Sequence, residues 1–195
     1  MLLKLLSTVF ICLIFSACST RHIQDSLSGS TSQRLITHSI DDLISNLKDV
    51  NFDELKDKKV FINSYFLSDS PLKNYADHRL ATELTSRYGA HIAQTQAESD
   101  RVMTVFYTSL GTDFDNFGIS IPLGYIPGFN ESTALNIITL EKFHGISELY
   151  YYIGKTGSEN RSKVQQAVVK TDALGLPFIT IPLSNIDRHE TDSWF

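Results

Sequence analysis

Cysteine is nearly absent from this chain, and the positions of the two that occur are informative. Cys12 and Cys18 both lie within the first 18 of 195 residues, and no cysteine follows them. Beyond Cys18 the chain therefore has no structural disulfide, no cysteine-ligated metal site and no thiol nucleophile. A chain without free thiols suits an oxidising compartment.

Long runs of one charge and long apolar runs are also missing. Without its first 17 residues the chain carries 16 basic and 22 acidic residues, a net charge of −6. It has no basic stripe of the kind that binds nucleic acid or anionic lipid. No stretch approaches the ~20 apolar residues of a membrane-spanning helix. We therefore expect no nucleic-acid partner and no multi-pass membrane protein.

Recognisable catalytic and metal-binding motifs are absent too. The chain has no phosphate-binding loop, no dinucleotide fingerprint and no nucleophile elbow, and no two of its histidines have i,i+4 spacing. Asp113, Asp115 and Gly118 match three positions of a calcium loop, but Phe117 stands where an oxygen ligand is needed. We interpret this stretch as a turn after a strand. We expect no catalytic residue, no metal and no cofactor, although a site assembled from distant histidines stays open.

The N-terminus carries a specific signal. One basic residue, Lys4, precedes an uncharged apolar segment over residues 5–15, and the small residues Ser16 and Ala17 then precede Cys18. This three-part pattern is typical of a cleavable secretory signal, and its apolar part is too short to span a membrane. We expect residues 1–17 to be a signal peptide.

The four residues Phe15, Ser16, Ala17 and Cys18 resemble the lipobox of bacterial lipoproteins, with Phe15 where leucine is usual. The resemblance implies that Cys18 receives diacylglycerol and becomes the first residue of the mature chain. Two or three acyl chains on one residue make a nearly permanent anchor, whereas a single chain binds reversibly. Ser19, where enterobacterial lipoproteins kept in the inner membrane have aspartate, favours the periplasmic face of the outer membrane. The alternative is an ordinary secretory signal that contains a cysteine.

The rest of the chain divides into three parts. Residues 18–39 are rich in serine and threonine and are expected to form a flexible tether behind the lipidated cysteine. Residues 40–180 are expected to form a single domain, and residues 181–195 an irregular tail.

Hydrophobic periodicity predicts the elements of that domain. A main helix starts after Ser70 and Pro71 and ends at Gly89, with an apolar residue at every fourth position. Another helix is expected from Ser39 to about Asp49. Strands are expected over 59–66, 91–94, 101–110, 133–143 and 146–155, with a hairpin at His144–Gly145, and residues 164–170 form a strand or a helix.

This order predicts an α+β fold, with a mixed, mostly antiparallel sheet and one main helix packed on it. Over about residues 58–155 the order is similar to small periplasmic domains of envelope-assembly lipoproteins, among them the curli-secretion lipoprotein and the amino-terminal domain of the Tol-system β-propeller protein. The chain also resembles many uncharacterised outer-membrane lipoproteins.

One uncharged stretch, Asn116–Asn130, is the candidate contact site. Pro122 and Pro127 argue against a central strand there. One interpretation is an exposed arm that docks a partner, self-associates or contacts lipid, and the other is a loop folded over the core. The candidate contact residues are the large apolar ones: Phe117, Ile119, Ile121, Leu123, Tyr125, Ile126 and Phe129.

A second candidate surface is the run Tyr150–Tyr151–Tyr152. Alternation in a strand places Tyr151 on one face and its two neighbours on the other, and an exposed pair would form a binding platform.

Together these features favour a lipid-anchored periplasmic protein that acts as a non-enzymatic binding or assembly component of an envelope complex, with a protein partner there. The alternatives are a carrier of a small ligand or lipid, and a periplasmic hydrolase with an unrecognised motif.

Overall fold

The computed structural model describes residues 20–23, 29–47, 50–123, 127–128, 134–177 and 179–184. The expected signal peptide and Cys18 lie outside the described residues, as do Tyr125, Ile126 and Phe129. The predictions made for them stay predictions.

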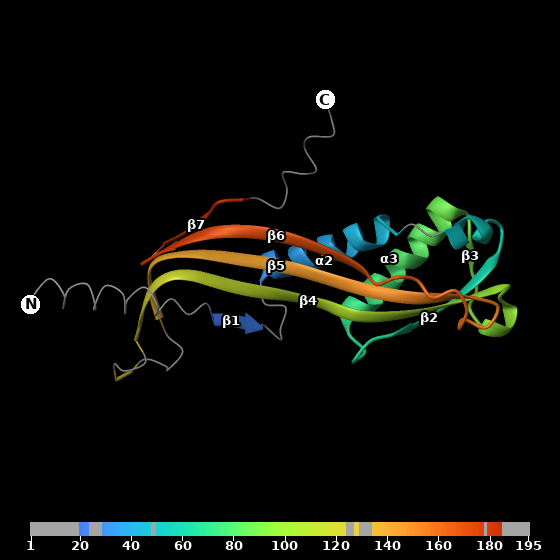
Figure 1. Cartoon of the computed structure of the whole chain (residues 1–195), viewed down its shortest axis with the longest axis horizontal. Coiled ribbons are helices and arrows are strands. Elements are labelled where there is room, and N and C mark those ends of the chain that lie inside the picture. Colours follow the sequence, from blue (N-terminus) through green and yellow to red (C-terminus); the bar gives the residue numbers. More distant parts are fainter. Residues whose placement is uncertain are drawn as a thin grey trace, which may run out of the picture. The chain divides into compact units, whose positions relative to one another are not determined.

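The described residues form one mixed sheet and two α-helices, whose arrangement can be followed in Figure 1. The strand order is β3-β2-β4-β5-β6-β7, and β1 pairs with β4. β2 is parallel to β3 and β4, whereas the β1–β4 and β6–β7 pairs are antiparallel. The expected α+β class is confirmed. The elements are β1 Thr20–Ile23, α2 Ser30–Ser45, η1 Val50–Leu55, β2 Lys59–Tyr65, α3 Pro71–Tyr88, β3 His91–Ile92, η2 Gln96–Glu98, β4 Arg101–Pro122, β5 Ala134–Gly154, β6 Gln165–Leu176 and β7 Ile179–Pro182.

The chain divides into two compact units. Unit 2 contains residues 26–112 and 145–169, and unit 1 contains residues 1–25, 113–144 and 170–195. Both α-helices belong to unit 2, whereas the described elements of unit 1 are all strands. The strands β4, β5 and β6 each contribute residues to both units.

Helix α3 forms as its sequence predicts. The Ser70 side chain accepts a hydrogen bond from the backbone nitrogen of Lys73 at 3.2 Å, and Pro71 opens the first turn. Gly89 ends the helix in the left-handed conformation, at φ 67°. Three apolar residues, each four positions from the next, form its buried face: Ala76, Leu80 and Leu84.

Residues 20–23 form β1 and helix α2 begins at Ser30, so the prediction of a flexible tether over residues 18–39 is wrong at both segments. Leu35, Ile36 and Ile40 are fully buried, and burying this apolar stripe stabilises a helix whose serines and threonines have modest propensity. Ser39 lies within the helix and does not start it. Its buried hydroxyl is 2.6 Å from that of Ser147 on β5.

Strand β5 is continuous, and the predicted hairpin at His144–Gly145 is wrong. Gly145 is needed for a close approach to a helix, not for a turn. A Cβ atom at this position would collide with the backbone carbonyl of Leu35 in α2. The small residues Gly145 and Ser147 therefore leave room for α2 to pack directly on the strand.

Strand β4 is also longer than predicted, since the expected turn over residues 111–118 is part of the strand. Residues Asp113–Asn116 pair with β1, and this backbone pairing outweighs the turn preference of aspartate, asparagine and glycine. Gly118, at φ 154°, lies so close to β5 that a Cβ atom would collide with the carbonyl of Ile138. Pro122 is tolerated because it is the last residue of the strand.

The core of unit 2 lies between its two helices and its strands (Figure 1). Phe52 from η1 stacks on Tyr151 of β5, with ring centroids 5.3 Å apart, and meets Tyr88 of α3 edge to face at 5.0 Å. Both Phe52 and Tyr151 are almost completely buried. These aromatic contacts fix η1 between the main helix and the sheet.

The close approach at Gly145 gives a test of the packing. Gly145→Ala should lower the free energy of unfolding by about 1–3 kcal/mol, because the added methyl group meets helix backbone that has no free space. Urea denaturation would measure the change.

Gly111→Ala is the matched control, since a Cβ atom on Gly111 of β4 meets nothing within 4 Å. This variant should be neutral or up to about 1 kcal/mol more stable than the parent. Equal effects of the two substitutions would contradict the packing described for α2.

Candidate interaction surfaces

Unit 1 has a large surface without charge. We name as the uncharged end its described residues 116–123, 134–140, 173–177 and 179–184, none of which is acidic or basic. Phe117 is 62% exposed and Ile119 is 64% exposed. Eight large apolar side chains of the uncharged end are exposed: Phe117, Ile119, Ile121, Ile137, Ile138, Ile179, Ile181 and Leu183.

Among its described residues, unit 1 has no buried cluster of large apolar side chains that compensates for this exposure. The buried side chains among the described residues of unit 1 are Thr139, Thr171 and Ala173, all small. The strands of the uncharged end are therefore held mainly by backbone pairing. Ile137 and Ile138 are consecutive in β5 and point to opposite faces of the sheet, so apolar side chains are exposed on both faces. Exposure of this many large apolar residues is typical of a contact surface.

Charge within unit 1 is segregated along the strands. Acidic and basic residues occur at 113–115 in β4, at 141–142 in β5 and at 170–172 in β6. These residues are the ones nearest in sequence to unit 2. Each of the three strands thus changes from a charged to an uncharged segment along its length.

The sequence-based contact residues fall partly on this surface. Phe117, Ile119 and Ile121 are exposed on β4, and Leu123 is half-buried. The interpretation of residues 117–122 as a loop folded over the core is wrong, because they form an exposed strand segment.

Sequence reasoning missed the five exposed apolar residues contributed by β5, β7 and the residue after β7: Ile137, Ile138, Ile179, Ile181 and Leu183. A usable signal was present, because residues 132–140 and 173–186 also lack charge.

Unit 2 carries a second surface, the aromatic row, which we define as Tyr65, Phe106, Tyr150 and Tyr152. Phe106 stacks between Tyr65 and Tyr150, with ring centroids 5.2 and 5.1 Å apart, and Tyr152 meets Phe106 edge to face. Tyr65 is about half exposed, whereas Tyr151, between the two row tyrosines of β5, is buried in the core. Tyr151 is buried in the core, whereas Tyr150 and Tyr152 are only partly buried.

A guanidinium group extends the row. The Arg161 guanidinium lies 4.9 Å from the centre of the Tyr150 ring, at cation–π distance. Planar aromatic groups beside an arginine are enriched in protein interfaces, because they bury a large area at low entropic cost.

A polar cluster connects α3 to β2 and β4. Asp77 accepts hydrogen bonds from Tyr107 at 3.0 Å and from Ser64 at 2.7 Å, and Lys73 lies 3.0 Å from the same carboxylate. Burial, and then the nearby charge of Asp77, raises the pKa of Tyr107 far above its usual value. The phenol therefore stays protonated in alkaline solution as well as at neutral pH, and it remains a hydrogen-bond donor. This role is the one expected of a structural link between helix and sheet.

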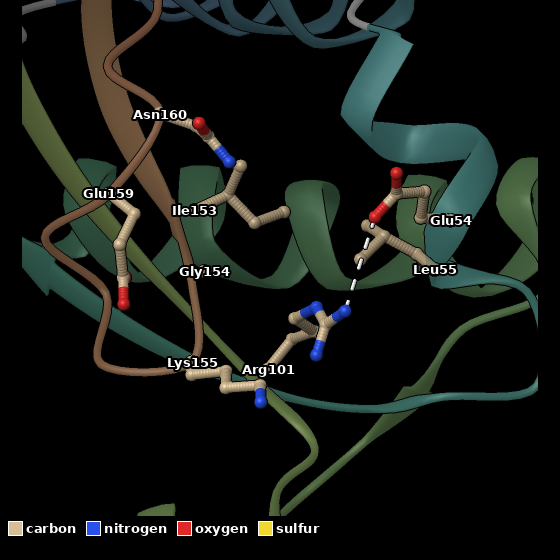
Figure 2. A pocket seen from close by; sticks show the side chains of 8 residues that line it. All are labelled: Glu54, Leu55, Arg101, Ile153, Gly154, Lys155, Glu159 and Asn160. Carbon is tan, nitrogen blue, oxygen red and sulfur yellow. Dashed lines mark ion pairs between the residues drawn. The ribbon is translucent and has the colours of Figure 1, made fainter.

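A pocket of about 210 Å³ lies between η1, the start of β4 and the end of β5 (Figure 2). Its lining includes charges of both signs, from the basic residues Arg101 and Lys155 and the acidic residues Glu54 and Glu159. Arg101 is 4.0 Å from Glu54. The pocket is smaller than the roughly 300–1,000 Å³ that is typical of sites for drug-sized ligands. Its charged lining also differs from that of a long apolar cavity.

The residues that match positions of a calcium loop in the sequence do not form a calcium-binding loop in the structure. Asp113 and Asp115 lie on an extended strand, and the Asp115 carboxylate is 3.6 Å from Nδ1 of His144. Among the described residues no group of three or more histidine, aspartate, glutamate or cysteine side chains is placed to hold a metal ion. In the same part of the chain, neither α2 nor α3 is long and apolar enough to cross a membrane.

No protein-family model matches the chain, and no curated protein sequence matches it.

The polar cluster yields a second prediction. Asp77→Ala should lower the free energy of unfolding by about 1–3 kcal/mol, because it leaves the buried Tyr107 hydroxyl without its acceptor. Tyr107→Phe should cost only about 1 kcal/mol, since Asp77 keeps Ser64 and Lys73 as partners. Urea denaturation of both variants compares them. A larger loss in Tyr107→Phe than in Asp77→Ala would contradict a structural role for Asp77.

Proposed function

We propose that this protein is a lipoprotein, anchored through Cys18 to the periplasmic face of the outer membrane, that acts as a non-enzymatic binding or assembly component of an envelope complex. The N-terminal pattern before Cys18 supports the anchor, since it combines a secretory signal with a lipobox-like end. Ser19 supports the outer membrane over the inner one.

The observation that carries a binding role is the exposure of the uncharged end. Eight large apolar side chains on strands without a core of their own are costly in water. Contact with another component of the envelope removes that cost. The aromatic row of unit 2 offers a further surface whose composition suits a protein partner.

The alternative functions find less support. A lipid or small-ligand carrier needs an enclosed apolar cavity, whereas the pocket beside Arg101 is small and lined by charged groups. A hydrolase needs a nucleophile beside a base or a pair of matched acid–base groups. Ser64 and Tyr107 both donate to Asp77, which is itself paired with Lys73, so this cluster favours a structural role.

The anchor is tested by removing its attachment atom. Cys18→Ser should move the protein from the membrane fraction to the soluble fraction, because no acyl chain can then be attached. Metabolic labelling with a radioactive fatty acid should mark the parent and leave the variant unmarked. Labelled Cys18→Ser protein, or an equal membrane share of both, would contradict the anchor.

The binding role is tested by affinity purification of the intact lipoprotein from its own membranes, after cross-linking. We expect a stoichiometric protein partner. If the aromatic row contacts it, Tyr65→Thr should lower recovery severalfold, because the exposed ring is lost while a strand-favouring residue remains.

Leu67→Thr provides the matched control, because Leu67 is 94% exposed and lies two residues beyond the row. It should recover as much partner as the parent. Recovery of no stoichiometric partner from the parent protein would overturn the binding role.

A further inference from the structure

We infer that the uncharged end of unit 1 rests on the lipid surface of the membrane to which Cys18 is anchored. This inference rests on the proposed anchor and names the molecule that the uncharged end contacts. Four observations on unit 1 lead to it: the register of β1, the length of chain before β1, the segregation of charge, and the open edge of β4.

The register of β1 fixes where the anchor enters unit 1. β1 is antiparallel to β4, with Ile23 opposite Asp113, Arg21 opposite Asp115 and Thr20 opposite Asn116. Residues nearer the N-terminus of β1 therefore lie opposite residues nearer the C-terminus of β4. The chain before Thr20 leaves β1 at the level of Asn116, where the uncharged end begins.

The chain before β1 is too short to separate the anchor from this surface. Only Ser19 lies between Thr20 and Cys18. Two residues span at most about 7 Å, whereas the six residues 117–122 of an extended strand span roughly 20 Å. A lipidated Cys18 therefore cannot lie farther than about 7 Å from Thr20, which pairs with Asn116 at the border of the uncharged end.

The distribution of charge fits a lipid surface. In unit 1, the acidic and basic residues of β4, β5 and β6 lie at 113–115, 141–142 and 170–172. Along each strand, these segments lie between the uncharged end and the part of the strand that belongs to unit 2. Within the uncharged end, the three strands and β7 carry no charged residue. A charged side chain is costly near hydrocarbon, whereas isoleucine and phenylalanine gain free energy there. Among the described residues, the Glu141 carboxylate reaches the border of this surface, where it accepts a hydrogen bond from Asn136 at 3.0 Å.

The open edge of β4 limits the depth of the contact. Within the part of the chain that the structure describes, β1 pairs with Asp113–Asn116 only, so residues 117–122 have a paired neighbour on the β5 side alone. Unpaired backbone groups cannot enter the hydrocarbon core without a large cost. The contact is therefore interfacial: apolar side chains enter the boundary between headgroups and acyl chains, and the strand edge stays hydrated.

The test uses a single reporter thiol on the intact lipoprotein. In the lipidated chain the Cys18 sulfur is occupied, and no other cysteine follows, so Ile119→Cys supplies the one free thiol. Val164→Cys is the control, because Val164 is 51% exposed but belongs to unit 2. Each is labelled with an environment-sensitive fluorophore and reconstituted into vesicles of phosphatidylethanolamine and phosphatidylglycerol, with or without a lipid-borne spin-label quencher.

We expect blue-shifted emission and severalfold quenching by the labelled lipid at position 119, and neither at position 164. Equal quenching at the two positions, or none at 119, would overturn the inference. A blue shift at 119 that the lipid quencher leaves intact, together with cross-linking to a protein, would assign this surface to a protein instead. In that case the proposed anchor stands, since Cys18→Ser tests it separately through fatty-acid labelling.

Discussion

Burial of one sheet face beneath two helices is the interaction on which the folded part of this protein depends. In unit 2, α2 and α3 cover one side of the strands with a continuous apolar layer, and η1 is fixed by Phe52 between Tyr88 and Tyr151. Close contact of α2 with β5 requires the small residues Gly145 and Ser147. Unit 1 has no such cover among its described residues. The strands β4, β5 and β6 each have one part in unit 2, which has an apolar core, and another part in unit 1, which has none among its described residues. Large apolar side chains of unit 1 are therefore exposed.

Two kinds of exposed surface result, and their chemistry differs. The aromatic row of unit 2 has rings, a phenolic hydroxyl at each of three tyrosines and a nearby guanidinium group, which together suit a protein surface with polar groups. The uncharged end of unit 1 has isoleucine, leucine and phenylalanine with no charged residue, which suits lipid. We propose a division of roles in which the lipid and the uncharged end hold the protein at the membrane and the aromatic row faces the partner. Neither role needs a catalytic group.

Local signals predicted some parts of the fold well. The cap at Ser70, the proline at Pro71 and the glycine at Gly89 determine α3 within the chain itself, and the α+β class follows from the order of elements. Predictions failed where distant residues decide the conformation. Serine favours the start of a helix, but Ser39 lies within α2 and is buried against Ser147. Glycine favours turns, but Gly145 leaves space for the Leu35 backbone. The turn expected near Asp113 failed for the same reason, because pairing with β1 holds it extended. The apolar contact site was predicted over residues 117–129 only, since nothing local at Ile137 or Ile179 shows that sheet pairing joins them to it.

Hydrogen–deuterium exchange of the lipoprotein, followed by mass spectrometry, tests most directly whether the uncharged end is covered in the membrane. The protein is compared in its native membranes and as the soluble Cys18→Ser chain. Amides of α3 and of β2 should exchange slowly in both samples, because they belong to the buried core of unit 2. Amides of residues 117–121 and 179–181 should exchange faster than these core amides in the soluble chain and more slowly in membranes, because a covered surface opens less often. Equal exchange of these segments in the two samples would contradict the claim that the uncharged end is a contact surface.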